Sequence, residues 1–351
     1  MYPMDSRTTV LVIGDVHIKL DNLLEIQTLE EKLLHTITVH QPDIIIFLGD
    51  VLHTHERVHT NCLNQAAQLF RMASSLRPTF VLVGNHDFIS NSQFLTTHHW
   101  MNPFKQWPNL SIIDQPYEIH HHTNRMICCP YVPDGRFVEA LHTLPSDFNN
   151  THMIFAHQTL DGVKLGMTVA AGIEEWKAEY PFVCSGHIHD RQRVQPNLYY
   201  TGTPMPHAFG ERNDKSVSLF TLDSGVITNH TELRLEVCTK RIEYLSLAEA
   251  KRFTVEVKPH QLIRLTIKAT QEEARAFKRT DKYKELVAAG VKIVLDETVR
   301  IESAPPVRNS FEGWLLDSIR ADPSTAHWYR KFVGRTPNDP ELFLLDIEEV
   351  E

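Results

Sequence analysis

The sequence predicts an α/β fold, because strand patterns alternate with helix patterns and polar loops follow the strands. We predict strands at Thr9–Ile13, Asp43–Leu48 and Thr79–Val83, separated by helices at Leu23–His40 and Asn61–Ser75. This βαβαβ order is typical of a largely parallel sheet covered by helices. Further strands are predicted at Arg125–Cys129, His152–Ala156 and Phe182–Cys184, followed by a more meander-like stretch at Val194–Tyr200 and Ser216–Thr221.

The loops after Ile13, Leu48 and Val83 are rich in His, Asp, Asn and Gly. In open α/β sheets, ligands bind at the carboxyl ends of the strands. We therefore expect these polar loops to meet at one edge of the sheet and to form a site there.

The composition describes a globular protein that buries a sizeable core, with 42% hydrophobic and 23% charged residues among 351. No apolar run approaches the roughly 20 residues that cross a bilayer, and the N-terminus lacks the pattern of a signal peptide. The five cysteines form neither a disulfide framework nor a zinc ribbon. We expect an intracellular protein, cytoplasmic or nuclear, without contact to a membrane.

The formal net charge of -9 argues against nucleic-acid binding through a broad basic surface. It does not exclude a nucleic-acid substrate, because bound divalent cations add positive charge that the formal count omits. The chain also contains 21 histidines, which directs attention to metal sites.

The pattern changes after about residue 245. A strand at Gln261–Ala269, a helix at Gln271–Ala288 and a strand at Val291–Leu295 predict a small appended βαβ unit. Two short helices rich in Phe, Trp and Leu follow a Pro-Pro linker, at Ser310–Arg320 and Ala326–Val333, before an acidic tail. We expect three parts, namely a domain at 1–245, a small domain at 246–302 and a C-terminal segment at 303–351.

Five short polar motifs follow predicted strands in order. They are Gly14-Asp15-Val16-His17, Gly49-Asp50-Val51-Leu52-His53, Gly84-Asn85-His86-Asp87, Ala156-His157-Gln158 and Gly186-His187-Ile188-His189. Two Asp, one Asn and four His suit a pair of divalent ions such as Mn²⁺, Fe²⁺ or Zn²⁺. The absence of cysteine from these motifs disfavours a structural zinc site.

The spacing within these motifs has a physical meaning. In an extended loop, Asp15 and His17 point to the same side and can hold one ion. His187 and His189 can do the same, or two ions can share them. Asp50, at the end of a central strand, can bridge two ions. Any one of these motifs alone is more often structural, but five in this order indicate a dinuclear centre.

Other histidines have simpler interpretations. We interpret His120–His122 as a solvated strand edge and His98 and His99 as part of a helix end. His55 and His59 are interpreted as surface residues near the site. Asp87 either orients a ring or caps the next helix.

The motif series resembles the calcineurin-like metallophosphoesterase superfamily, whose pattern is D-X-H, G-D, G-N-H-[DE], a lone His and then G-H-X-H. Within it, His53 at the third place after Asp50 and the segment Tyr200–Glu211 are similar to the SbcD-type recombination nucleases, in compact phage or viral form. The resemblance covers residues 9–212. It implies a two-sheet sandwich flanked by helices, with a small α+β capping domain and C-terminal helices.

The resemblance also implies the role of each residue. Asp15, His17 and His189 would hold one metal ion, Asn85, His157 and His187 the other, and Asp50 would bridge them. The ions would be two Mn²⁺, although Fe²⁺ or Zn²⁺ also suit the ligands. A hydroxide formed from shared water would attack the phosphodiester, His86 would protonate the leaving group, and His53 would position the phosphate.

The family implies partners as well. These are DNA ends, an SbcC-type SMC-like coiled-coil ATPase docked on the C-terminal helices, and a second copy of the chain in a homodimer. The function would be exo- and endonucleolytic processing of DNA ends in repair or recombination. Two alternatives stay open: a stand-alone phosphodiesterase or phosphatase for nucleotides or small phosphoesters, and a non-catalytic subunit that keeps metals only as a scaffold.

Overall fold

The computed structural model describes residues 6–55, 57–256 and 258–297. The C-terminal segment at 303–351, including both predicted helices, lies outside the described residues. By its contacts the chain divides into two compact units, one of residues 1–268 and 275–296 and the other of residues 269–274 and 297–351. No helix among the described residues is long and apolar enough to cross a membrane.

The first sheet has six strands, of which the middle ones run parallel. Its order is β14 (Val226–Arg234), β13 (Ser216–Asp223), β1 (Arg7–Ile13), β2 (Ile44–Phe47), β3 (Thr79–Leu82) and β4 (Leu110–Ile113). Strands β1 to β4 are parallel, and β13 is antiparallel to β1 and to β14. The predicted βαβαβ order is confirmed.

The second sheet repeats this plan with parallel strands at its centre. Its order is β11 (Gln192–Gln195), β12 (Leu198–Tyr200), β10 (Phe182–Ser185), β7 (Met153–Ala156), β6 (Asn124–Cys128) and β5 (Tyr117–His121). The meander-like stretch predicted at Val194–Tyr200 is confirmed, because it contains a turn between two antiparallel strands. Pro196 cannot donate to a strand ladder, and Pro196-Asn197 turns the chain so that β11 and β12 pair antiparallel.

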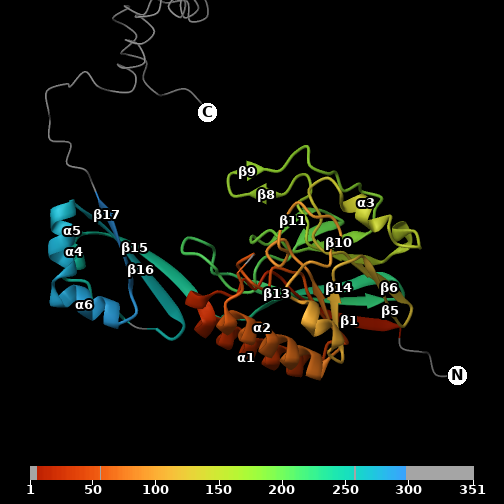
Figure 1. The fold of residues 1–351 in the computed structure, drawn as a ribbon, viewed down its shortest axis with the longest axis horizontal. Coiled ribbons are helices and arrows are strands. Elements are labelled where there is room, and N and C mark those ends of the chain that lie inside the picture. The colour runs from red at the N-terminus through yellow and green to blue at the C-terminus, as the bar shows by residue number, and fades with distance from the viewer. Residues whose placement is uncertain (1–5, 56, 257, 298–351) are drawn as a thin grey trace, which may run out of the picture. The chain divides into compact units, whose positions relative to one another are not determined.

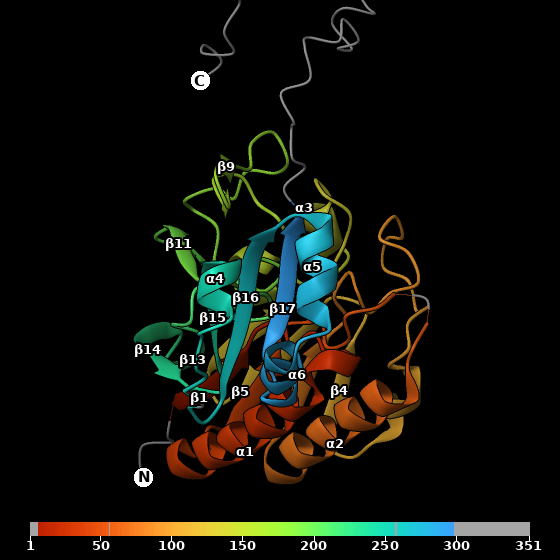
Figure 2. The ribbon, with the colours of Figure 1, turned by 90° about the vertical axis from the view of Figure 1, so that its left-hand side faces the viewer.

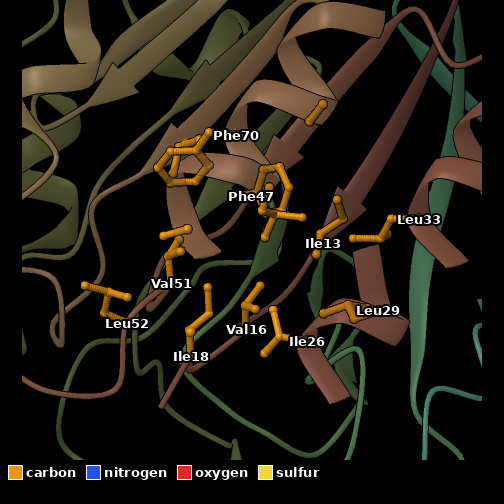
Figure 3. Close-up of a cluster of buried hydrophobic side chains, with 14 of the residues drawn as sticks. Ile13, Val16, Ile18, Ile26, Leu29, Leu33, Phe47, Val51, Leu52 and Phe70 are labelled. Atoms are coloured by element: carbon orange, nitrogen blue, oxygen red, sulfur yellow. The ribbon is translucent and has the colours of Figure 1, made fainter. Parts of the chain in front are cut away.

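Helices α1 (Leu23–His40) and α2 (Thr60–Leu76) lie side by side along one face of the first sheet (Figure 1). The buried residues of α1 include Ile26, Leu29 and Leu33, spaced by three and four so that they share one face. Figure 3 shows Leu29 and Leu33 beside Ile13 of β1, in the cluster that also contains Phe47. This packing anchors the ends of β1 and β2, from which two site loops begin.

The two sheets face each other across a second apolar layer. Val12 and Ile46 of the first sheet share a buried cluster with Phe155 and Cys184 of the second. A third cluster covers the outer face of the second sheet and includes residues of α3 (Phe137–Leu141). The result is the two-sheet sandwich flanked by helices that the family resemblance implied.

A third, small sheet contains β15 (Thr239–Ser246), β16 (Gln261–Ala269) and β17 (Lys292–Glu297). Figure 2 shows α5 (Gln271–Lys278) and α6 (Asp281–Ala288) on one face of it, where Phe277 and Leu286 meet Leu265. The prediction of a single helix at Gln271–Ala288 was wrong, because Thr280 ends the first helix and caps the second through the N–H of Tyr283. Strand β15 begins before residue 246, and the proposed domain division stays a prediction.

The remaining elements are short connections. They are the 3₁₀ helices at Leu20–Asn22, Asn102–Gln106 and Phe148–Asn150, the strands β8 (Lys164–Leu165) and β9 (Thr168–Val169), and α4 (Leu247–Ala250). His98 and His99 precede one of these 3₁₀ helices and do not end an α-helix, so that prediction was wrong.

Candidate metal centre

Five loops bring the predicted ligands together, and each loop follows the carboxyl end of a parallel strand. The loop after β1 carries Asp15 and His17, that after β2 carries Asp50 and that after β3 carries Asn85. From the second sheet, β7 is followed by His157, and β10 by His187 and His189. Because the strands that precede these loops run parallel within each sheet, their ends and these side chains meet at one edge of the sandwich.

The backbone is strained at three of these positions. His17, Asp50 and His187 have φ values of 47°, 48° and 75°, which L-residues with a side chain rarely adopt. Such conformations persist only where the surroundings over-determine them, and they concentrate at functional sites.

Glycine before the ligands allows the loops to approach one another closely. A Cβ on Gly84 would collide with the backbone nitrogen and carboxylate of Asp50, and a Cβ on Gly49 would lie 2.8 Å from Nδ1 of His157. Gly49 also has a φ of +112°, which is accessible to glycine but not to other residues. The two glycines therefore decide how closely Asp50 approaches its neighbours.

Asp15, His17 and His189 form the first group that could hold a metal ion, with ligand atoms within 4.8 Å of one another. Nε2 of His17 lies 3.0 Å from Nε2 of His189 and 3.5 Å from Oδ2 of Asp50. The carboxylate of Asp15 accepts hydrogen bonds from the backbone N–H of His187, which fixes its orientation. The two imidazole nitrogens and the carboxylates thus face a common point.

Asn85, His157 and His187 form the second group. Oδ1 of Asn85 lies 2.9 Å from Nε2 of His157 and 2.8 Å from Nδ1 of His187, and these two nitrogens are 3.2 Å apart. Asp50 joins this group through Oδ1, 3.4 Å from Nε2 of His157. Asp50 therefore faces both groups with different oxygens, as a bridging ligand would.

The chemistry of the second group fits a cation. Nδ1–H of His157 donates to the carbonyl of Leu48 at 2.8 Å, so its Nε2 presents a lone pair to the carbonyl oxygen of Asn85. Two acceptors at 2.9 Å repel each other unless a proton or a metal ion lies between them. The donor set of nitrogen and oxygen suits Mn²⁺, Fe²⁺ or Zn²⁺, and the residues present therefore fit a divalent metal.

The charges around His157 explain how the site responds to cations. Burial alone would lower the pKa of His157, but the carboxylates of Asp50 and Asp15 outweigh burial and raise this pKa to about 9. Burial likewise tends to raise the pKa of Asp50, yet the charge of His157 holds it far below its usual value. The buried carboxylates of Asp50 and Asp15 thus stabilise a positive charge at His157.

His86, His53 and His55 lie on the open side of the centre. Nδ1 of His86 lies 2.7 Å from the carbonyl of His53, so its Nε2 is left for other partners, 4.0 Å from Oδ2 of Asp50. The ring of His55 stacks on His86 with centroids 4.4 Å apart. Nδ1 of His53 lies 3.4 Å from Nδ1 of the predicted ligand His17. The two predicted catalytic histidines therefore border the centre, and His55 supports one of them.

Of the two roles that the sequence suggested for Asp87, the contact with a ring is present, and the ring is the indole of Trp100. The buried carboxylate of Asp87 accepts hydrogen bonds from the backbone N–H groups of Gly84, Val51 and Leu52 and from the indole N–H of Trp100 at 2.9 Å. It ties the loop of Asp50 to the loop of Asn85. Burial, with a smaller effect of the Asp50 charge, raises the pKa of Asp87 to about 7.

Glu211 and Lys215 lie beside the predicted ligand His189. Neither residue was assigned a role from the sequence. Oε1 of Glu211 lies 3.9 Å from Nδ1 of His189, while its carboxylate accepts hydrogen bonds from the backbone of His207 and Ala208. Nζ of Lys215 donates to the carbonyl of His189 and pairs with Glu211 at 3.1 Å. A carboxylate behind a histidine ligand fixes the ring and raises its basicity. The four-residue spacing of Glu211 and Lys215 was the available signal.

Four of the remaining described histidines lie outside the two ligand groups. His120 pairs with Glu118 at 3.2 Å. His121, the last residue of β5, contacts Thr8 near the start of β1. His59 caps α2 by accepting from the N–H of Asn61. His99 is buried, with Nε2 3.1 Å from Asp114.

Comparison with known proteins identifies the family. The model of the calcineurin-like phosphoesterase family matches residues 8–191, which hold all seven predicted ligands. This chain belongs to the calcineurin-like phosphoesterase family. Members of this family use divalent metals, and the chain is accordingly a metal-dependent phosphoesterase. The assignment of each ligand to one ion stays a prediction.

Two viral relatives resemble nearly the whole chain. "Putative phosphoesterase 078R" of Invertebrate iridescent virus 3 is 36% identical over 292 residues, covering 82% of this chain and 83% of the relative. "Putative phosphoesterase 244L" of Invertebrate iridescent virus 6 is 37% identical over 276 residues, covering 77% and 97%. Among solved structures, a novel phosphatase of Mycoplasma pneumoniae matches 66% of this chain and 94% of its own with 9% identity and a TM-score of 0.37, too low to carry an argument.

Proposed function

We propose that this phosphoesterase is a DNA nuclease of the SbcD type, which hydrolyses phosphodiester bonds at DNA ends. The family itself supports only phosphoester hydrolysis. The proposal for DNA rests on the segment Tyr200–Glu211 and on His53, the two features that resemble SbcD-type nucleases within the wider superfamily.

The observation that carries the proposal is the contact of this segment with the centre. Nε2 of His207 lies 2.9 Å from the backbone carbonyl of Asp15, and Glu211 stands behind the ligand His189. A Cβ on Gly14 would collide with the carbonyl of Gly202, so the segment packs directly on the first ligand loop. The part of the sequence that resembles nucleases is therefore a wall of the site rather than a distant insertion.

The residues of the chain have distinct tasks in hydrolysis. When bound, two divalent cations lower the pKa of water and offset the charge of the phosphate. Asp50 lies between the two ligand groups and faces each of them with a different carboxylate oxygen. In the protonated ring of His86, Nδ1–H stays on the carbonyl of His53 and Nε2–H can donate to the leaving oxygen. His53 is exposed and lies beside His86, where it can contact a non-bridging oxygen.

We propose Mn²⁺ as the metal, because carboxylate, amide and imidazole ligands without cysteine suit it and SbcD-type nucleases use it. Loading the chelated protein with Mn²⁺, Fe²⁺, Zn²⁺ or Mg²⁺ and measuring hydrolysis tests this choice. Higher activity with Zn²⁺ than with Mn²⁺ would contradict it.

The deciding experiment uses purified full-length chain with Mn²⁺ and end-labelled duplex DNA, beside the variants His86→Ala and His142→Ala. His142 follows α3, away from the ligand loops, and is a matched control. We expect digestion by wild type and His142→Ala and its loss in His86→Ala. Hydrolysis of bis(p-nitrophenyl) phosphate without any cleavage of DNA would overturn the nuclease proposal while keeping the phosphoesterase. The scaffold alternative predicts that neither substrate is hydrolysed.

The competing function is hydrolysis of nucleotides or small phosphoesters, which the net charge of -9 favours. It gives no use to the Tyr200–Glu211 wall. Comparing kcat/KM for a dinucleotide with kcat/KM for a long duplex that contains the same dinucleotide step separates the two functions. Only a nuclease is expected to hydrolyse the longer substrate more efficiently.

The partners are also proposals. An SbcC-type coiled-coil ATPase would bind the helices predicted from the sequence at Ser310–Arg320 and Ala326–Val333, and a second copy of the chain would form a homodimer. Deleting residues 303–351 should abolish co-purification with such an ATPase and leave hydrolysis of small diesters unchanged. Sedimentation of the full chain measures the homodimer directly.

A further inference from the structure

A cavity of about 450 Å³ lies beside the metal centre, within the compact unit of residues 1–268 and 275–296. Two of its wall residues reach the backbone of the ligand loop after β1. Nδ2 of Asn22 donates to the carbonyl of His17 at 3.0 Å, and Nε2 of His207 donates to that of Asp15. The volume falls within the range of roughly 300–1,000 Å³ typical of small-ligand sites.

The walls of this cavity are positively charged, although the chain as a whole is acidic. Lys19, Lys240, Arg264 and Lys292 line it, against the carboxylates Asp21 and Glu25. Four cations and two anions leave an excess of two positive charges. Lys19 already pairs with Asp21 at 3.7 Å. Among the described residues, no carboxylate forms an ion pair with Lys240, Arg264 or Lys292.

Burial makes one of these three cations, Lys240, informative. Lys240 is only 9% exposed, and its ammonium group donates to the carbonyl of His207 at 2.9 Å. Buried charges are normally paired, because removing them from water is costly. Both Lys240 and Arg264 lie over the ring of Phe209, 5.9 and 5.3 Å from its centroid. Phe209 is therefore a common neighbour of both cations.

Two buried polar atoms on these walls have no hydrogen-bond partner within the described chain. They are Nε of Arg264, which is a donor, and Nδ1 of His207, which is an acceptor because Nε2–H is used by Asp15. Buried polar atoms are nearly always satisfied. An acceptor oxygen beside Arg264 and a hydroxyl or a water beside His207 would satisfy these two atoms.

We propose that this cavity is a subsite for a non-scissile phosphate of a nucleic-acid strand, held by Arg264, Lys240 and Lys292. The inference rests on the proposed nuclease function and deepens it, because a second phosphate site selects a polymer over a small phosphoester. Arg264 suits phosphate through its fork of N–H donors, and Phe209 offers a flat apolar surface to the attached sugar or base.

The test is the double variant Arg264→Gln/Lys292→Gln. Its matched control is Lys251→Gln/Lys278→Gln, which removes the same charge from exposed positions. Equilibrium binding of a fluorescent oligonucleotide is measured by anisotropy between low and moderate salt. We expect affinity to fall about tenfold and the slope of log affinity against log salt to decrease by about 1 for each cation removed. The control should bind as wild type does.

A second readout separates the subsite from the catalytic centre. Hydrolysis of bis(p-nitrophenyl) phosphate, which has one phosphate, should stay within about twofold in the double variant, while KM for the oligonucleotide rises. Oligonucleotide affinity equal to that of the control would overturn the subsite. If the double variant unfolds at a lower temperature than wild type, the single variant Lys292→Gln, at an exposed position of the wall, tests the same prediction.

Remaining outcomes distinguish the subsite from the nuclease proposal. Binding that depends on Arg264 and Lys292, without cleavage of DNA, would keep the subsite and overturn the nuclease. Inorganic phosphate provides the last arm. If it stabilises the wild type but not the double variant, while oligonucleotide affinity is the same in both, the cavity is a site for free phosphate and the proposal is overturned.

Discussion

Asp50 accepts a hydrogen bond from the backbone N–H of His86 at 2.8 Å, so one carboxylate links the predicted bridging ligand to the predicted general acid. Asp50 follows β2 and His86 follows β3, and the same Oδ1 that binds this N–H lies 3.4 Å from Nε2 of His157. Loss of the carboxylate therefore affects both ligand groups and the position of His86.

Asp50→Asn should abolish tight binding of the metal pair and lower hydrolysis by more than about 100-fold. The amide has nearly the shape of the carboxylate but lacks its charge, and it can direct N–H groups toward the N–H of His86. Metal content after gel filtration and hydrolysis of bis(p-nitrophenyl) phosphate measure the effect. Asp281→Asn, at a solvent-exposed position, is the control. Two metal ions per chain in Asp50→Asn would refute a bridging role.

His86→Ala should keep the metal ions but lower kcat by about 10²–10⁴, the usual range for a general acid. The loss should be small for esters of p-nitrophenol, which leaves without protonation, and large for alkyl or nucleoside esters. Steady-state kinetics with both types of ester measure this difference. An equal loss on both would mean that His86 binds a non-bridging oxygen instead.

Much of this site was predictable from the sequence because it is carried by local motifs. Each predicted ligand follows a strand, and the ends of parallel strands meet wherever the sheet forms. Asp15 and His17 could thus be placed on one side of a loop before the fold was known. The resemblance to the family implied that two sheets pack as a sandwich, which hydrophobic periodicity alone did not indicate.

What escaped prediction depends on contacts between distant segments. The role of Asp87 arises because Val51, Leu52 and Trp100 direct their N–H groups at it, and nothing local in Gly84–Asp87 shows this. The break at Thr280 depended on a cap that competes with a continuous amphipathic pattern. Neither the burial of Lys240 nor the solitary Nε of Arg264 leaves a trace in the sequence.

Asp87→Asn should destabilise the protein by about 1–3 kcal/mol, because the amide turns its own N–H groups toward donors that the carboxylate satisfied. Activity should fall as well, since the loops of Asp50 and Asn85 lose their common anchor. Chemical denaturation and metal affinity are the measurements. Asp161→Asn, outside the ligand loops, controls for the loss of a charge. A loss of stability without any change in metal affinity would restrict Asp87 to the fold.

Gly84→Ala should impair metal binding more than Gly166→Ala does. The added methyl group at residue 84 would collide with Asp50, whereas nothing lies within 4 Å of the corresponding position at residue 166. Gly166 has a φ of +65°, so its substitution costs about 1 kcal/mol of backbone strain without a collision. Thermal unfolding with and without Mn²⁺ compares the two. Equal stabilisation of both variants by Mn²⁺ would show that the Asp50 loop moves freely.

Metal affinity should rise with pH up to about 9, because a metal ion must displace the proton that Asp50 and Asp15 hold on His157. Below this pKa, each pH unit should raise the apparent association constant by up to about tenfold per displaced proton. Calorimetry in buffers of different ionisation enthalpy counts the protons released.

In the presence of a chelator, the dependence of folding stability on pH has the opposite sign. The raised pKa of folded His157 stabilises the protein fully below its ordinary value of 6.5, and this contribution is lost as pH rises through about 9. Unfolding in EDTA between pH 6 and pH 9.5 should therefore become easier with pH, while with Mn²⁺ it should not. Identical pH profiles with and without metal would show that His157 is not a ligand.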